Sequence, residues 1–154
     1  MKRQYFGTDG VRGPVGGPLI NPEFARRLAA AAARFFRESA DGIATDTVVI
    51  GRDTRASGAD LEAGIAAGVR AEGFAVSAIG VAPTPVVSFA VRQFKAAFGV
   101  VITASHNPAT DNGIKFFSPN GTKLTDADEA RIETLLESVG DTGPVGISDD
   151  DNGQ

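Results

Sequence analysis

The chain has 154 residues, of which 42% are apolar and 22% charged, a balance typical of one globular domain rather than of a collagen-like or disordered chain. It contains no cysteine and one histidine, which excludes a disulfide framework, thiol catalysis and a multi-histidine metal site within the chain. A net charge of −4 without a basic run argues against general nucleic-acid binding. No apolar run approaches the roughly 18 residues that span a bilayer, and the first residues lack the apolar core of a signal peptide. We therefore expect a cytoplasmic protein with neither nucleic acid nor a membrane as its partner.

Helix and strand patterns alternate along the chain. Asn21 followed by Pro22 predicts the start of a helix that ends near Asp41-Gly42. Later helices are predicted to begin at three places: Ser57 with Asp60 as a capping-box pattern, Thr84-Pro85, and Thr125 with Asp128. Buried strands are predicted at Thr47–Ile50, Phe74–Ile79, Phe98–Thr103 and Ile114–Phe117. The third of these is the most apolar and is expected near the centre of the sheet.

Small and apolar residues indicate how the predicted helices pack. Gly64 and Gly68 lie within the second helix, which they weaken but where they permit a close neighbour. In the third helix, Val87, Val91 and Phe94 are expected to point inward.

The alternation of strands and helices predicts an α/β fold. We expect a three-layer αβα sandwich with a mostly parallel, mixed sheet. Its antiparallel part is expected after a tight turn at Asn120-Gly121, which would fold residues 122–124 back as a hairpin. Residues 1–140 are expected to form the domain, and the acidic, turn-forming residues 141–154 a linker or tail.

In folds of this kind ligands bind beyond the carboxyl ends of the strands, so the loops after the first three predicted strands are where chemistry is expected. The loop after the third strand carries a hydroxyl, an imidazole and an amide in succession, from Ser105, His106 and Asn107. Asp111–Gly113 then lets the chain turn, and Lys115 follows on the next strand. Such a set could hold a phosphate or another anion, although an ordinary loop has the same local pattern.

Two further polar segments are candidates for the same site. Gly7–Gly13 has three glycines in seven residues, which permits close approach of the backbone, and Arg12 supplies a fork of donors suited to phosphate. The spacing of a P-loop is absent, and a tight surface turn is the alternative. In Gly51–Arg55, Arg52 and Asp53 could pair with each other, or either arginine could face the crevice.

Together these segments resemble the α-D-phosphohexomutase family through three motifs: Phe6–Gly13, Gly51–Arg55, and Thr103–Pro108 together with Asp111–Lys115. The Gly-Thr-Asp opening and Asn112–Phe117 are most similar to the bacterial phosphoglucosamine mutase branch. The resemblance extends over nearly the whole chain, and three ordered motifs make it specific for the superfamily rather than for the substrate.

The resemblance implies an enzyme that interconverts 6-phosphate and 1-phosphate sugars, here glucosamine phosphates, through a bisphosphate intermediate. Ser105 is implied as the active serine, carried as phosphoserine, and Arg12 as a contact to it. Lys115 is implied as a general acid/base or an electrostatic partner. His106 would supply a hydrogen bond or only order the loop, and Asn107 is expected to fix the loop through side-chain-to-backbone hydrogen bonds.

The family's enzymes have four domains, and the chain resembles only the first. The aspartate loop that binds the metal belongs to the second domain, and Asp149–Asp151 is no substitute because consecutive carboxylates do not converge on one octahedral ion. The resemblance therefore implies Mg²⁺ with the phosphate on Ser105 as this chain's only ligand. It also implies a hexosamine phosphate substrate and the later domains of the same enzyme as partners. We expect the 154-residue chain alone to have no substantial mutase turnover.

Three alternatives remain open from the sequence. The chain could be a phosphoglucomutase or phosphomannomutase domain, because the loops that select the sugar lie elsewhere in the family. It could be a non-catalytic module that binds sugar phosphates. A serine hydrolase would use Ser105 and His106, but the Gly-x-Ser-x-Gly spacing is absent because Thr103 and Asn107 stand at the flanking positions.

Overall fold

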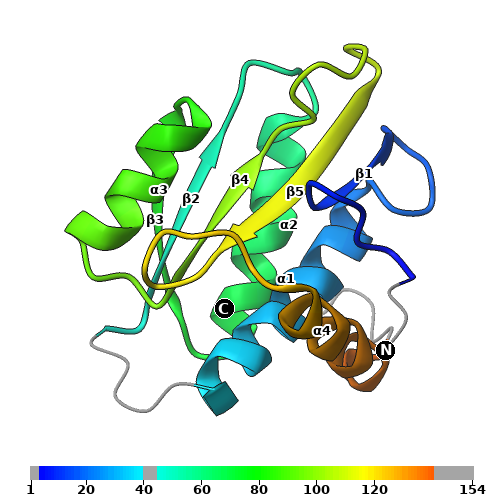
Figure 1. Cartoon of the computed structure of the whole chain (residues 1–154). Helices are drawn as coiled ribbons and strands as arrows, with labels where there is room; N and C mark the ends of the chain where they lie inside the picture. The colour runs from blue at the N-terminus through cyan, green and yellow to red at the C-terminus, as the bar shows by residue number, and fades with distance from the viewer. Residues whose placement is uncertain (1–3, 40–44, 141–154) are drawn as a thin grey trace, which may run out of the picture.

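A five-stranded sheet lies at the centre of the computed structural model, which describes residues 4–39 and 45–140 (Figure 1). Its strands are β1 (Val11–Pro14), β2 (Thr47–Arg52), β3 (Ala75–Val81), β4 (Phe98–Ile102) and β5 (Asp111–Phe117). They lie in the order β1-β5-β4-β2-β3, and every residue of β4 is buried. The most apolar run therefore occupies the middle of the sheet, as the sequence predicts.

Helices cover both faces of the sheet, which confirms the three-layer αβα sandwich (Figure 1). They are α1 (Pro22–Ser39), α2 (Gly58–Ala71), α3 (Thr84–Gln93) and α4 (Asp126–Val139). On one face α1, α2 and α4 form the larger core with alternate strand residues such as Val48 and Ile50. On the other face α3 contributes Val87 and Val91 to a smaller core that contains Val49. Because successive strand residues point to opposite faces, these two cores account for strands that are apolar throughout.

The sheet is mixed and mostly parallel. β2 pairs in parallel with β3 and β4, whereas β5 pairs antiparallel with β4 and with β1, so four of the five described strands run in one direction. The prediction that residues 122–124 fold back as the second strand of a hairpin is wrong. The turn at Asn120-Gly121 forms, but the residues after it contribute only an isolated bridge between Phe117 and Lys123. Leu124 turns into the core just before α4 begins, so the chain leaves the sheet, and the edge strand beside β5 is β1.

All four described helices begin near the predicted residues, but capping side chains are formed only at α1 and α4, and α2 and α3 have none. Asn21 Oδ1 accepts a hydrogen bond of 2.8 Å from a main-chain N–H in the first turn of α1. Thr125 and Asp128 form a reciprocal capping box at α4. The capping box predicted at Ser57 is wrong: the residue has helical dihedral angles, and its hydroxyl instead accepts a 2.7 Å hydrogen bond from Asn112 Nδ2. A contact distant in sequence has replaced the local one.

Close packing of α1 against α2 depends on the glycines noted in the sequence. A Cβ at Gly68 would collide with the main chain of Arg26, and one at Gly64 with the main chain of Pro22. The prediction that these glycines permit a close neighbour is confirmed.

One apolar position differs from expectation. Val87 and Val91 are buried as predicted, but Phe94 is 50% exposed because α3 ends at Gln93 and Phe94 only caps it. The predicted end of the first helix near residues 41–42 and the predicted linker at 141–154 lie outside the described residues.

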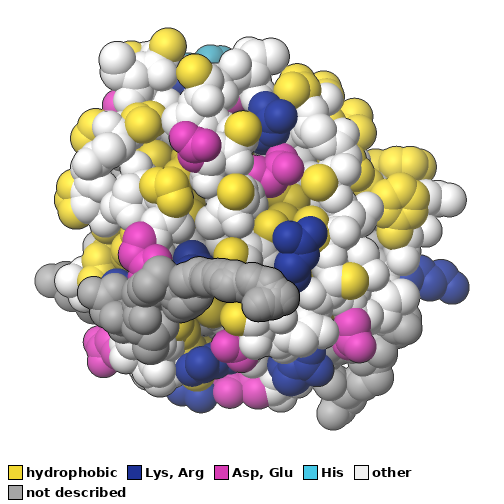
Figure 2. Space-filling view, turned by 180° about the vertical axis from the view of Figure 1, so that it is seen from behind, with side chains coloured by type: hydrophobic (Ala, Val, Ile, Leu, Met, Phe, Trp, Pro, Cys, Tyr) yellow, Lys and Arg dark blue, Asp and Glu magenta, His cyan; other side chains and the backbone are white. Residues whose placement is uncertain are grey.

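Within the described residues, none of the helices has the length and apolar character needed to cross a membrane. Figure 2 shows that on the side opposite to the view of Figure 1, basic and acidic side chains are interspersed rather than gathered by sign.

Candidate functional site

The serine loop, defined as residues 103–111, follows the carboxyl end of the central strand β4. Ser105 is exposed there and has a φ of +50°, in the left-handed region that non-glycine residues seldom adopt. Its N–H donates to Thr103 Oγ1 at 3.0 Å, and the Asn107 N–H donates to the Ala104 carbonyl at 2.9 Å. An uncommon backbone conformation that is held by surrounding contacts is typical of functional sites.

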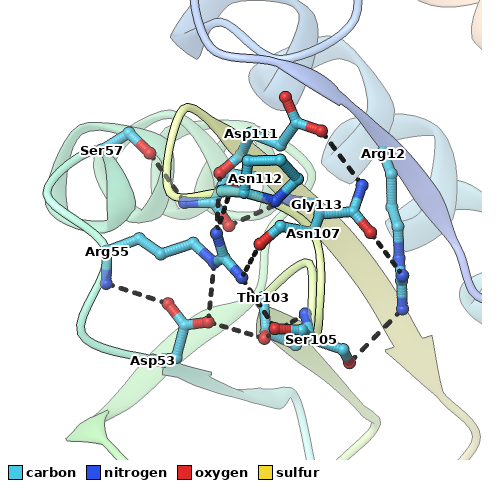
Figure 3. A network of polar contacts seen from close by, with 11 residues as sticks. Arg12, Asp53, Arg55, Ser57, Thr103, Ser105, Asn107, Asp111, Asn112 and Gly113 are labelled. Carbon is cyan, nitrogen blue, oxygen red and sulfur yellow. Dashed lines mark hydrogen bonds and ion pairs between the residues drawn. The ribbon is translucent and has the colours of Figure 1, made fainter.

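Arg12 reaches this loop from the edge strand β1. Its Nη2 lies 3.4 Å from Ser105 Oγ, and its Nη1 donates to Asn107 Oδ1 at 3.2 Å (Figure 3). Asp9 forms an ion pair with the same guanidinium at 3.8 Å. The contact to Ser105 Oγ is long for a hydrogen bond, and the Arg12 side chain is 26% exposed, so its outer donors face an open site.

Asn107 links side chains of β1 and β5. Its Oδ1 accepts from Arg12, and its Nδ2 donates to Asp111 Oδ2 at 3.1 Å. We expected it to fix the loop through bonds from its side chain to the backbone. The structure differs, because both described bonds of this amide go to other side chains, which orient Arg12 as well as the loop.

Asp53 and Arg55, in the segment that follows β2, support the serine loop through hydrogen bonds. Asp53 Oδ2 accepts hydrogen bonds from Thr103 Oγ1 at 2.7 Å and from Arg55 Nε at 3.1 Å, and its Oδ1 accepts one from the Arg55 N–H at 3.0 Å. Burial raises the pKa of the Asp53 carboxyl, but the hydrogen bonds from Thr103 and Arg55, with the positive charge of Arg55, outweigh burial, so this pKa lies below its ordinary value. Asp53 is therefore a carboxylate that holds the loop.

The pairing within this segment was only partly anticipated. Asp53 pairs with Arg55, whereas Arg52 turns away and pairs with Glu62 on α2 at 3.1 Å. Arg55 lies against the main chain of the serine loop and is the residue of the site that sequence reasoning undervalued. Its position, shortly after a strand that parallels β4, was the available signal.

Lys115 lies on β5 and shares a face of the sheet with Arg12. Arg12 is the register partner of Gly113, and residues 113 and 115 point to the same side of the strand. The Lys115 ammonium lies 5.6 Å from the centre of the Phe117 ring. Among the described contacts, none joins Lys115 to Ser105.

His106 is exposed, and its imidazole forms no hydrogen bond or ion pair with any residue that the structure describes. The described contacts therefore give no support to a role for His106 in ordering the loop. They also give none to a serine hydrolase, whose base must hydrogen-bond the nucleophile. The described contacts thus join Arg12 to Ser105 and to Asn107, and none of them joins the side chains of Lys115 or His106 to this group.

The opening motif forms a hollow beside Arg12. Its volume is about 240 Å³, and it is lined by Tyr5, Gly7, Thr8, Asp9, Gly10 and Arg12. The Lys123 ammonium donates to the Thr8 carbonyl at 2.6 Å and so anchors the tip of this motif. The glycine-rich segment therefore offers backbone and one guanidinium to a polar ligand.

The described residues do not by themselves fit a divalent metal site. They contain no group of three or more histidine or acidic side chains placed to hold an ion. Near Ser105, the Asp53 carboxylate is held by Thr103 and Arg55, and the Asp111 carboxylate accepts from Asn107. A Mg²⁺ ion needs several oxygen ligands with octahedral geometry, which this loop does not supply.

Comparison with known families agrees with this geometry. Residues 3–142 match the family model described as phosphoglucomutase/phosphomannomutase, alpha/beta/alpha domain I. The chain belongs to this family. The resemblance to the phosphohexomutases drawn from the three motifs is thereby confirmed.

Curated relatives and solved structures agree. A phosphoglucosamine mutase 2 of Shewanella sp. (strain MR-4) is 54% identical over 139 residues, which cover 90% of this chain and 30% of the relative. A phosphoglucosamine mutase of Bordetella parapertussis is 54% identical over 142 residues, covering 88% of this chain and 31% of the relative. A putative phosphomannomutase from Thermus thermophilus superposes with a TM-score of 0.77 at 34% identity, covering 88% of this chain and 30% of that one. The phosphohexomutase domain thus spans about 30% of the length of these relatives.

Proposed function

We propose that this phosphohexomutase domain carries the phosphoserine of a phosphosugar mutase that interconverts glucosamine 6-phosphate and glucosamine 1-phosphate. The observation that carries the proposal is the exposed Ser105 Oγ with the Arg12 guanidinium 3.4 Å away. The names of the similar relatives support the reaction and its substrate.

The reaction requires a serine whose phosphoryl group can leave and return. A phosphoserine carries about −1.5 to −2 charges and three acceptor oxygens, which suit the fork of donors on Arg12. In the first half-reaction a sugar hydroxyl oxygen bonds to phosphorus while the bond from phosphorus to Ser105 Oγ breaks, and the hydroxyl proton is transferred away as Oγ gains one. The bisphosphate then reorients, and its other phosphoryl group returns to Oγ by the reverse exchange. Positioning and charge neutralisation are the main contributions that a protein makes to such a transfer.

The remaining side chains have supporting parts in this proposal. Lys115, on the same face of the sheet as Arg12, serves as the acid/base or as an electrostatic partner of the transferring phosphoryl group. Asn107 orients the Arg12 guanidinium through its Oδ1. His106, which is exposed, contributes a hydrogen bond to bound substrate rather than to the loop.

The rest of the enzyme supplies what this chain lacks. We propose that the phosphate on Ser105 is the chain's only ligand to Mg²⁺ and that the carboxylate ligands come from a later domain, since the described residues hold no such group. We further propose that residues 1–140 are the phosphoserine domain, that 141–154 lead towards the later domains, and that the enzyme is cytoplasmic, with which the absence of cysteine is compatible. The 154-residue chain alone should then show no substantial mutase turnover.

The proposal is tested by looking for the phosphoryl group. The full-length enzyme is incubated with a hexose 1,6-bisphosphate, and its intact mass and phosphopeptides are measured. We expect one phosphoryl group on Ser105, its loss in Ser105→Ala, and its retention in Ser138→Ala, which alters an exposed serine on α4. A phosphoryl group elsewhere, or none together with no mutase turnover, overturns the proposal. Labelling of Ser105 by a fluorophosphonate probe would instead favour a hydrolase.

The substrate is tested separately. A coupled assay on the full-length enzyme compares kcat/KM for glucosamine, glucose and mannose phosphates. We expect the glucosamine phosphates to have the highest value. A higher value for glucose or mannose phosphates would assign the chain to the phosphoglucomutase or phosphomannomutase branch, and binding of all three without turnover would make it a non-catalytic module.

A further inference from the structure

Arg55 makes an unusually complete set of contacts with the serine loop. Its side chain is 11% exposed, and its guanidinium is directed at the main chain of the loop (Figure 3). Nη2 donates to the carbonyls of Ser105 at 2.8 Å and Asn107 at 3.1 Å, and Nη1 to those of Pro108 at 2.7 Å and Asp111 at 3.3 Å. One guanidinium therefore binds four main-chain carbonyls within seven consecutive residues.

These contacts leave Arg55 no donor for a ligand. A guanidinium has five N–H groups, and the fifth, on Nε, donates to Asp53 Oδ2 at 3.1 Å. Arg12, by contrast, is 26% exposed and directs its outer donors at Ser105 Oγ and Asn107. The two arginines therefore differ in kind: Arg12 faces the reacting oxygen, and Arg55 faces only the backbone that carries it.

Both polar groups of the Ser105 main chain, its carbonyl and its N–H, form hydrogen bonds. Arg55 Nη2 binds its carbonyl, and Thr103 Oγ1 accepts from its N–H at 3.0 Å. The Thr103 hydroxyl in turn donates to Asp53, which accepts from Arg55. The closed circuit of hydrogen bonds explains how a serine stays at a φ of +50°, which is unfavourable for a side chain with a Cβ.

We propose that Arg55 is a positioning residue for phosphoryl transfer, which holds the Ser105 backbone in its left-handed conformation so that Oγ faces Arg12. This inference rests on the proposed function, because only a phosphoryl-transfer serine needs its Oγ in line with the sugar hydroxyl. Without the guanidinium, Ser105 relaxes towards a common backbone conformation and its Oγ moves away from Arg12. Misplacement of a reacting atom by about 1 Å can lower a rate by roughly 100-fold.

The test compares Arg55→Lys in the full-length enzyme with the wild type. Lysine keeps the charge but has its donors on one atom, so it cannot span four carbonyls. We expect kcat to fall by about 100-fold with KM for the hexose phosphate changed by less than about threefold. Amide hydrogen exchange should accelerate in residues 103–111 and stay unchanged in the buried strand β4.

Arg52→Lys is the matched control, because Arg52 lies at the same strand end but pairs with Glu62 and makes no described contact with the serine loop. It should alter neither kcat nor exchange in that loop. If Arg55→Lys does not stay folded, Thr103→Val is used instead. It removes the acceptor of the Ser105 N–H and leaves Arg55 intact. We then expect the same fall in kcat and the same acceleration of hydrogen exchange in residues 103–111.

Two results would overturn the inference. The first is a rate of amide hydrogen exchange in the serine loop of Arg55→Lys that equals the wild-type rate. The second is faster exchange in that loop with an unchanged kcat, which would make Arg55 purely structural. A wild-type enzyme without mutase turnover would instead refute the proposed function, and the exchange comparison would then decide alone whether Arg55 holds the Ser105 backbone.

Discussion

Arg12 and Gly113 are register partners across β1 and β5, and the side chain of Arg12 runs over Gly113 on its way to the serine loop. A Cβ at Gly113 would lie 2.9 Å from Arg12 Cγ and 2.6 Å from the Thr103 carbonyl oxygen. Both contacts are closer than real Cβ atoms permit. The missing side chain at position 113 is therefore what lets an arginine on the edge strand reach a serine beyond the central strand.

Gly113→Ala should disturb both the fold and the site. The added methyl group meets backbone at the Thr103 carbonyl, which cannot move aside as a flexible side chain can. We expect a loss of about 1–3 kcal/mol in the free energy of unfolding. In the full-length enzyme kcat should also fall, because Arg12 is pushed away from Ser105. Urea unfolding and a coupled activity assay measure the two effects.

Gly13→Ala is the control for that change. Gly13 is the next residue of β1, and a Cβ there meets only Ile20 Cγ1 at an ordinary 3.7 Å. Its free energy of unfolding and kcat should stay close to those of the wild type. Equal effects of the two substitutions would contradict the close-approach explanation.

Lys115→Ala should slow phosphoryl transfer more than it weakens binding. The ammonium is on the face of the sheet that also carries Arg12 of β1, so it can stabilise charge that develops in the transition state. We expect kcat of the full-length enzyme to fall by about 100-fold or more with little change in KM, and Lys115→Arg to retain part of the activity. A rise in KM at constant kcat would show that Lys115 only binds the ground state.

Glu133 fastens the start of the chain to α4. It is 8% exposed, its Oε2 accepts from the N–H groups of Tyr5 and Phe6 at 2.8 Å each, and its Oε1 accepts from the N–H of Gln4. In Glu133→Gln one of the two acceptor oxygens is replaced by an NH2 group, which is itself a donor and cannot accept hydrogen bonds from these N–H groups. We expect a loss of about 1–3 kcal/mol in the free energy of unfolding, measured by urea denaturation.

The matched control for Glu133 lies one turn further along α4. Glu137 is exposed, so Glu137→Gln should leave the free energy of unfolding within about 0.5 kcal/mol of the wild type. Faster hydrogen exchange in residues 4–10 only in Glu133→Gln would locate the damage at the opening motif. Equal stabilities of the two variants would refute the anchoring role.

Asp53 should make stability depend on pH in the acid range. Its pKa in the folded protein lies below the unfolded value of about 3.9, so the unfolded state binds more protons there. The stabilisation is fully present above the unfolded pKa and is lost as pH falls through the lower folded pKa. In Asp53→Asn the free energy of unfolding should therefore change less steeply between about pH 5 and pH 2. Urea unfolding over a pH series measures this slope, and an unchanged slope would contradict the assignment.

Local sequence patterns predicted several elements well because their causes are local. The Thr125–Asp128 capping box joins residues three apart, and the run that became β4 carries its apolar character in itself. The position of Ser105 followed from these elements, since a loop at the carboxyl end of a central strand lies at the ligand edge of the sheet.

Other features could not be predicted because distant contacts decide them. β1 has only four residues, Val11–Pro14, and is extended because it pairs with β5. The Ser57 hydroxyl binds Asn112, which is 55 positions away, instead of capping its own helix. Phe94 is exposed because α3 stops before it, although its spacing from Val91 is helical.

The amino-acid sequence by itself determined the layers of this domain, the central strand and the polar loop that follows it, since caps, apolar runs and turns act through near neighbours. The resemblance implied Arg12 as a contact of Ser105, but only the tertiary structure decided that Arg55 binds the backbone of that loop and that Arg52 pairs with Glu62 instead. The Arg12–Ser105 contact spans 93 positions and the Arg55–Ser105 contact 50, and both depend on the register of strands that the chain pairs only on folding. The two arginines have the same side chain, and only their surroundings make one face the serine oxygen and the other its backbone.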